Sequence, residues 1–298
     1  MVGAKIVMPG SQLDPVSVCA LIEAEGVTIS AGVPTVWLAA RDHLKATGRV
    51  PHTLQRIVIG GSAVPPKLFD DFEEMGIRVC HAWGMTEMSP VGTVSFVKGE
   101  LDGLPPEARR LKRLKQGTFS PIVGWRVLDD DHRPVAQDGV ARGELYVRGP
   151  AIAAAYYRNE PATGAAFSGG WFKTGDIVTI DEDGYMEIVD RSKDMIKSGG
   201  EWISSVELEN TLMGHHDVKE ACVFGLAHEK WIERPVAAVV LRTGAHRDEA
   251  ALRDWLAARV AKWWLPDRIV FIDAIPRSGV GKFLKRELRE RYADLLIR

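Results

Sequence analysis

Four polar, glycine-rich segments of this sequence carry the residue types that nucleotide and phosphate chemistry needs. They are His81–Glu87, Gly170–Asp176, Asp190–Glu201 and Pro276–Lys282. In the first segment a flat aromatic ring, a glycine, a hydroxyl and a carboxylate follow one another, and these groups suit a purine, a phosphate and a magnesium ion in turn. A strand-to-helix turn capped by Thr86 would give the same letters, so the first segment alone leaves both interpretations open.

The second and third segments each allow a functional and a plain interpretation. Asp176 follows Gly175 at an expected loop apex, where its carboxylate would accept two hydrogen bonds from the hydroxyls of a ribose. Thr-Gly-Asp is also ordinary turn chemistry. The third segment gathers charges and glycines where the pattern of the sequence changes, which indicates either a hinge or a simple linker.

The fourth segment ends in Lys282 and resembles the tail of a phosphate-binding loop. A Walker A motif requires glycine five positions before the Gly-Lys pair and Ser or Thr after it. Pro276 and Phe283 occupy those two positions, which excludes the motif. The segment still predicts a lysine on a flexible loop, able to deliver a positive charge to a phosphoryl group.

The elements that must position these segments come in three successive patterns. Up to about residue 95, short apolar runs alternate with helical stretches, which is typical of a mostly parallel sheet. We expect strands at 4–8, 27–29, 56–59 and 77–80, and helices at 14–25, 34–46 and 65–75. The loops that follow parallel strands share one crevice, so Gly60–Ala63 and His81–Glu87 are expected to face the same pocket.

Beyond a basic helix expected at 107–115, the pattern changes twice. Residues 124–189 are short, turn-punctuated segments typical of antiparallel β-structure. From about residue 190 a small α+β unit follows, with helices expected at 206–212, 249–260 and 284–296. The fold class is therefore α/β, with a domain over 1–190 (1–120 α/β, 121–190 β-rich) and an α+β lid domain over 191–298.

Composition narrows the functional classes. The chain has 298 residues, of which 46% are hydrophobic and 26% charged, and its formal charge is −2, so no basic field points to nucleic acid. Cys19, Cys80 and Cys222 lie far apart and match no disulfide or zinc pattern. With no apolar run of about 18–20 residues, we expect a cytoplasmic protein without an integral membrane segment, whose open sheet edge favours a homo-oligomer.

In their order and spacing these motifs resemble the adenylate-forming superfamily of acyl-CoA synthetases, peptide-synthetase adenylation domains and beetle luciferase. The matching segments are Gly32–Thr35, Gly60–Ala63, Trp83–Glu87, Gly143–Gly149, Trp171–Asp176, Asp190–Asp194, Lys197–Gly200 and Pro276–Lys282. Val33–Trp37 and Lys262–Pro266 look most like bacterial medium- and long-chain fatty acyl-CoA ligases.

The resemblance implies that a carboxylic acid, most simply a fatty acid, reacts with ATP and Mg²⁺ to give acyl-AMP, from which CoA displaces AMP. The implied contacts to ATP and AMP are Gly61, Ser62, Ala63, His81, Trp83, Gly84, Met85, Thr86, Asp176 and Arg191. Thr86 would contact the α-phosphate, Glu87 would hold magnesium, and Lys282 would bridge acyl and phosphate oxygens. Lys193 matches the family's hinge. CoA would meet Lys197, Ser198, Gly199, Gly200 and Glu201.

One departure bears on activity. The family's Ser/Thr/Gly-rich loop that wraps the ATP phosphates is absent from these residues, so we expect the sequence to match the C-terminal part of a longer enzyme, with Met1 an internal start, and leave its isolated activity open. The alternatives are an aryl- or amino-acid-adenylating enzyme and a non-catalytic protein that binds AMP or CoA. His215-His216-Asp217 offers metal-ligand types, but a turn at a helix end is favoured.

Overall fold

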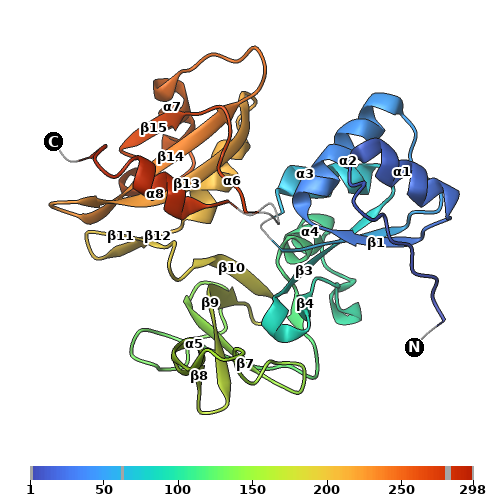
Figure 1. Ribbon diagram of the computed structural model, residues 1–298, viewed down its shortest axis with the longest axis horizontal. Helices are drawn as coiled ribbons and strands as arrows, with labels where there is room; N and C mark the ends of the chain where they lie inside the picture. Colours follow the sequence, from blue (N-terminus) through green and yellow to red (C-terminus); the bar gives the residue numbers. More distant parts are fainter. Residues whose placement is uncertain (1–2, 62–63, 279–282, 297–298) are drawn as a thin grey trace.

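The computed structural model describes residues 3–61, 64–278 and 283–296. Within these residues the chain forms three five-stranded sheets, which follow one another along the sequence (Figure 1). Ser62, Ala63 and Lys282, which were predicted to bind nucleotide or take part in catalysis, lie outside the described residues. No helix in the described part of the chain is long and apolar enough to cross a membrane.

The first sheet has the order β1-β2-β3-β4-β5. Its strands are β1 (Ile29–Gly32), β2 (Arg56–Ile59), β3 (Arg78–Gly84), β4 (Val91–Val94) and β5 (Thr118–Phe119). The pairs β1–β2 and β2–β3 are parallel, whereas β3–β4 and β4–β5 are antiparallel. The sheet is thus mixed rather than mostly parallel, because only a short 3-10 turn, and no crossover helix, separates β3 from β4.

Three helices cover one face of this sheet (Figure 1). They are α1 (Pro15–Ala24), α2 (Pro34–Thr47) and α3 (Pro66–Glu74), and each begins with proline, whose fixed φ suits the first helical turn. The helices enclose Trp37 and Phe72, whose rings meet edge to face with centroids 5.8 Å apart. The helices predicted at 14–25, 34–46 and 65–75 are therefore confirmed.

The strand predicted at 4–8 is wrong. These residues are unpaired coil, and Ile6 and Met8 are 82% and 79% exposed. An apolar run becomes a strand only where a neighbouring strand supplies backbone partners, and residues 4–8 form no strand pairing within the described part of the chain.

The basic helix α4 (Pro106–Leu114) joins the first sheet to the second through ion pairs. Arg110 binds Asp70 of α3, with Nε 2.7 Å from Oδ1. Lys112 lies 2.8 Å from Asp181, which is in the turn between two strands of the second sheet. Helix α4 therefore connects α3 to that turn of the second sheet.

The second sheet is entirely antiparallel, as predicted for residues 124–189. Its main path is β10-β9-β7-β6, with β8 paired to β9. The strands are β6 (Gly124–Leu128), β7 (Gly143–Arg148), β8 (Phe167–Ser168), β9 (Trp171–Ile180) and β10 (Met186–Arg191), and α5 (Glu160–Ala166) precedes β8.

The third sheet has the order β12-β11-β14-β13, with β15 parallel to β14. Its strands are β11 (Ile196–Ser198), β12 (Glu201–Ile203), β13 (Val218–His228), β14 (Ile232–Leu241) and β15 (Arg268–Phe271). The helices α6 (Ser205–Met213) and α7 (Glu249–Ala257) share one apolar core with this sheet, and α8 (Lys285–Arg291) shares another. The helix predicted at 284–296 is thus shorter than expected.

Candidate functional site

The buried carboxylate of Asp176 joins the first two sheets. Trp83 of β3 donates its indole N–H to Asp176 Oδ2 at 2.9 Å, and Arg191 Nε lies 2.7 Å from Oδ1. Asp176 is 1% exposed. Arg191 faces it because the two residues are partners in the antiparallel pairing of β9 and β10. The structure thus brings together three of the predicted nucleotide-binding residues from three different strands.

The loop predicted around Asp176 is instead the middle of a strand. Gly170–Asp176 leads into and forms part of β9, and Gly175 adopts a left-handed conformation with φ of 73°. The pairing of β7 with β9 shifts register beside this glycine, as at a β-bulge, which re-aims a side chain. Thr174 stabilises the bulge, because its hydroxyl donates to the Leu145 carbonyl and accepts from the Asp176 N–H.

Glu87 is held by residues that the sequence did not single out. It lies in a 3-10 turn, η1 (Thr86–Met88), in which Thr86 is exposed and Glu87 is half-buried. Tyr156 donates its hydroxyl to Glu87 Oε1 at 2.8 Å, and the Ala153 N–H donates to the Glu87 carbonyl at 2.8 Å. Tyr156 belongs to an irregular segment without periodicity, so no local pattern identified it as a partner.

Glycines permit the close backbone approach at this end of the sheet. A Cβ on Gly84 would lie 1.8 Å from the carbonyl oxygen of Pro90, and one on Gly60 would lie 2.7 Å from the carbonyl oxygen of Ala82. Gly61 follows with a positive φ of 89°. The described parts of Gly60–Ala63 and His81–Glu87 therefore meet where β2 and β3 end.

His81 lies behind this edge and makes its contacts inside the protein. It is 3% exposed, its Nδ1 lies 2.8 Å from the Leu114 carbonyl oxygen, and Gln116 Nε2 lies 3.4 Å from its Nε2. Burial lowers the pKa of His81 to about 4. A neutral imidazole that donates through Nδ1 and accepts through Nε2 satisfies both contacts.

A cavity lies at the other end of the first sheet. Its volume is about 410 Å³, and it is lined by Gln55, Arg56, Glu73, Gly76, Ile77 and Arg78. Arg56 and Arg78 begin β2 and β3. The cavity is thus at the amino ends of these strands, opposite the edge where Trp83 contacts Asp176.

The residues predicted to hinge the lid and to bind CoA follow β10. Lys193 is exposed in a turn closed by N–H groups of residues 194 and 195, both donating to the Arg191 carbonyl. Gly199 and Gly200 form the turn between β11 and β12. In Figure 1 this hairpin lies away from β3.

The rest of the predicted CoA cluster has partners within the third sheet. The Lys197 ammonium lies over the Trp202 ring, 4.4 Å from its centroid, and the Ser198 hydroxyl accepts from Arg234 at 3.0 Å. Glu201 is exposed at the start of β12. A Cβ on Gly199 would come within 2.7 Å of the Trp231 ring, so glycine is needed at that turn.

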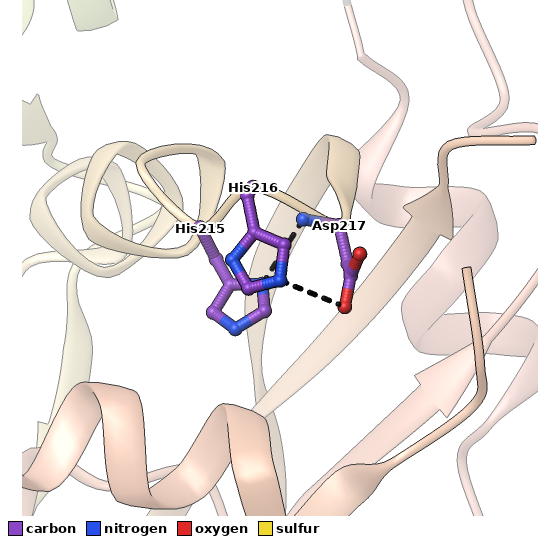
Figure 2. Close-up of side chains that lie close together, drawn as sticks. All are labelled: His215, His216 and Asp217. Atoms are coloured by element: carbon purple, nitrogen blue, oxygen red, sulfur yellow. Dashed lines mark hydrogen bonds and ion pairs between the residues drawn. The ribbon is translucent and has the colours of Figure 1, made fainter.

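The three adjacent side chains His215, His216 and Asp217 form a turn after α6 (Figure 2). Their candidate ligand atoms lie within 4.8 Å of one another. Nδ1 of His215 already accepts the Asp217 N–H at 3.2 Å, and His216 Nε2 lies 3.4 Å from Asp217 Oδ2. These contacts are those of a helix-end turn.

The three-part fold, with an α/β part, a β-rich part and a smaller α+β part, and the contacts among Trp83, Asp176 and Arg191 point to one class of enzymes. Residues 1–157 match the model of the AMP-binding enzyme family, and residues 207–282 match the AMP-binding enzyme C-terminal domain. The chain belongs to the AMP-binding enzyme family.

Curated relatives agree with this assignment. The chain is 53% identical over 295 residues to a long-chain-fatty-acid–CoA ligase of Thermus thermophilus, which covers 99% of this chain and 54% of the relative. It is 42% identical over 299 residues to a medium-chain-fatty-acid–CoA ligase of Ectopseudomonas oleovorans, covering 100% of this chain and 54% of the relative. The chain thus spans about half the length of these relatives.

Solved structures share the fold. An amide bond synthetase from Marinactinospora thermotolerans superposes with a TM-score of 0.82 at 29% identity, covering 94% of this chain and 56% of that one. ATP-bound MatB from Rhodopseudomonas palustris superposes with a TM-score of 0.81 at 29% identity, covering 95% and 54%.

Proposed function

We propose that the protein takes part in the AMP-forming activation of a fatty acid and its transfer to CoA. In the first half-reaction a carboxylate oxygen attacks the α-phosphorus of ATP, and pyrophosphate leaves. In the second the CoA sulfur attacks the acyl carbon, AMP leaves, and the thiol proton passes to solvent. The observation that carries the proposal is the Asp176 carboxylate held by Trp83 and Arg191, in a chain that is 53% identical to a relative named as a long-chain-fatty-acid–CoA ligase.

In this proposal Asp176 and Arg191 hold the ribose. Trp83 and Arg191 orient the Asp176 carboxylate, whose oxygens would accept hydrogen bonds from the ribose hydroxyls. Trp83 lies along the adenine, and the backbone of Gly61, Gly84 and Met85 lines the phosphates. His81 supports β3 from behind, because its ring contacts the protein itself.

Glu87 is the proposed magnesium ligand. Magnesium is usually bound by one or two carboxylates together with substrate phosphates, and a half-buried carboxylate oriented by the Tyr156 hydroxyl fits that set. The ion would neutralise phosphate charge, while Thr86 contacts the α-phosphate and Lys282 bridges the acyl and phosphate oxygens during adenylation.

The second half-reaction is assigned to the α+β part. We propose that the chain divides into a domain over 1–190 and a lid domain over 191–298, with Lys193 as the hinge between them. ATP and CoA would be substrates. Lys197, Ser198, Gly199, Gly200 and Glu201 would line the pantetheine path, where the glycine turn leaves room for a thin chain.

Binding of AMP by the chain itself tests the nucleotide site. We expect calorimetry to show AMP binding that weakens by about tenfold or more in Asp176→Asn, since a hydrogen bond to a charged group contributes roughly 1.5–3 kcal/mol. Asp130→Asn is the matched control, because Asp130 is exposed in the turn that follows β6. Equal AMP affinity in the Asp176 variant and the wild type would overturn the site.

The acid substrate is tested by ATP–pyrophosphate exchange with octanoate, palmitate, benzoate and an amino acid. Exchange that depends on a fatty acid supports the proposal. Exchange with benzoate or the amino acid alone would make the protein an aryl- or amino-acid-adenylating enzyme. AMP binding without exchange for any acid would favour the non-catalytic alternative for this chain.

A further inference from the structure

A buried polar network connects α8 to the end of β10. Lys285 Nζ lies 2.8 Å from Glu209 Oε1 of α6, and the two side chains are only 11% and 10% exposed. The same ammonium donates to Ser205 Oγ at 2.5 Å, and the Ser205 hydroxyl donates to Asp190 Oδ2 at 2.7 Å. Asp190 is itself 1% exposed. The network therefore runs from the last described helix to the residue before Arg191.

The charges of this network depend on one another. Burial alone would lower the pKa of Lys285, but the carboxylates of Glu209 and Asp190 outweigh it and raise that pKa, so the ammonium is retained. Glu209 Oε1 also accepts the Val223 N–H at 2.8 Å. Removing one member of a buried pair leaves the other charge without compensation, so loss of Lys285 alone would leave Glu209 buried without its cationic partner.

A second contact from α8 reaches the turn that follows Arg191. Arg289 Nη2 lies 2.8 Å from Asp194 Oδ1. Lys285 and Arg289 are four residues apart, which places them on one face of α8. The Asp194 N–H donates to the Arg191 carbonyl, and Asp190 Oδ1 accepts the Arg191 N–H at 2.7 Å. Helix α8 therefore holds the residues that bracket Arg191.

We infer that Lys285 and Arg289 are positioning residues for Arg191, through which α8 sets the geometry of the Asp176 cluster. Neither side chain makes a described contact with Asp176 or Trp83, so their effect reaches the cluster through Asp190 and Asp194. For its link to nucleotide binding this inference rests on the proposed function. It makes nucleotide affinity sensitive to a helix that begins more than ninety residues further along the chain.

The test uses Arg289→Met, Lys285→Met and the matched control Arg286→Met in the full chain. Arg286 neighbours Lys285 on α8 but its side chain is 85% exposed and pairs only with Glu290 among the described residues. Because Lys285→Met leaves Glu209 uncompensated and so threatens folding, the pair variant Lys285→Met/Glu209→Met is included. Lys285→Arg is the conservative variant, because it keeps the positive charge, and we expect it to keep the wild-type Arg191 exchange rate and AMP affinity.

Two measurements separate this inference from the proposed function. In NMR spectra the Nε–H signal of Arg191 reports its ion pair with Asp176 without any ligand, and we expect this proton to exchange with solvent about tenfold faster in Arg289→Met than in Arg286→Met. AMP affinity should fall by about tenfold in the same variant, a usual size for coupling between sites.

An Arg191 signal that is unchanged in Arg289→Met and in the pair variant overturns the inference, whatever the AMP affinity. If the wild type binds no AMP, the proposed function fails, and the Arg191 signal alone then decides whether α8 positions this residue. The inference is supported if the Arg191 Nε–H exchanges faster in Arg289→Met and in Lys285→Met/Glu209→Met, while Arg286→Met and Lys285→Arg behave like the wild type.

Discussion

Acidification should destabilise this protein through His81 in a defined pH window. The pKa of His81 is lowered from 6.5 to about 4 by burial, so the unfolded state binds the proton first. The stabilisation is fully present above about pH 6.5 and is lost as the pH falls toward 4. At 1.36 kcal/mol per pKa unit, the difference amounts to about 3 kcal/mol in all, of which about 2.5 kcal/mol is lost at pH 4.5.

The assay is urea unfolding of the wild type and of His81→Asn at a series of pH values. Asparagine keeps an N–H donor near the position of Nδ1 but does not titrate, so the difference in unfolding free energy between the two proteins isolates His81. His52→Asn is the control, because His52 is exposed. A difference between wild type and His81→Asn that stays constant from pH 7.5 to 4.5 would refute the reasoning.

Three further predictions concern folding. Gly84→Ala should cost at least about 3 kcal/mol, because its Cβ would meet a backbone carbonyl at 1.8 Å, and a melting temperature near the wild type would contradict this. Asp71→Asn removes the carboxylate that three cations of α2 and α3 surround, so the free energy of unfolding in urea should fall by about 3 kcal/mol. Added salt should change the free energy of unfolding of this variant little. The thiols of Cys19, Cys80 and Cys222 are buried with raised pKa values and should react with a disulfide reagent only after unfolding; rapid modification of the folded protein would refute this.

Local signals were enough for most elements of the fold. The helix at 34–46 and the strand at 56–59 have clear starts and periodic apolar positions, and both are found within one residue of the prediction. The 4–8 run also contains adjacent β-branched residues, Ile6 and Val7, yet forms no strand, because pairing partners are not a local property. The sequence also missed β4 and β5, which are short and lack alternation.

The site was harder to predict because its contacts join distant residues. The family resemblance assigned Trp83, Asp176 and Arg191 to the same nucleotide, and the structure brings these residues into contact. No motif showed which contacts orient these side chains. Gly175 was interpreted as part of a loop because glycine marks both turns and bulges, and Tyr156 became visible only once the fold set it beside Glu87.

The contacts of Asp176 also say something about how such a site would bind its ligand. A buried carboxylate that is held by an indole on one side and a guanidinium on the other cannot adopt another rotamer without losing both contacts and leaving the buried Trp83 N–H without an acceptor. Its orientation is therefore fixed during folding, so an arriving ribose would not have to order it, and preorganisation of this kind lowers the free-energy cost of binding. The same reasoning explains why the bulge at Gly175 matters. In regular β-structure, inserting or removing one residue turns the following side chains to the other face of the sheet, so restoring regular pairing here would move Asp176 away from Trp83 even though every residue of the motif was still present.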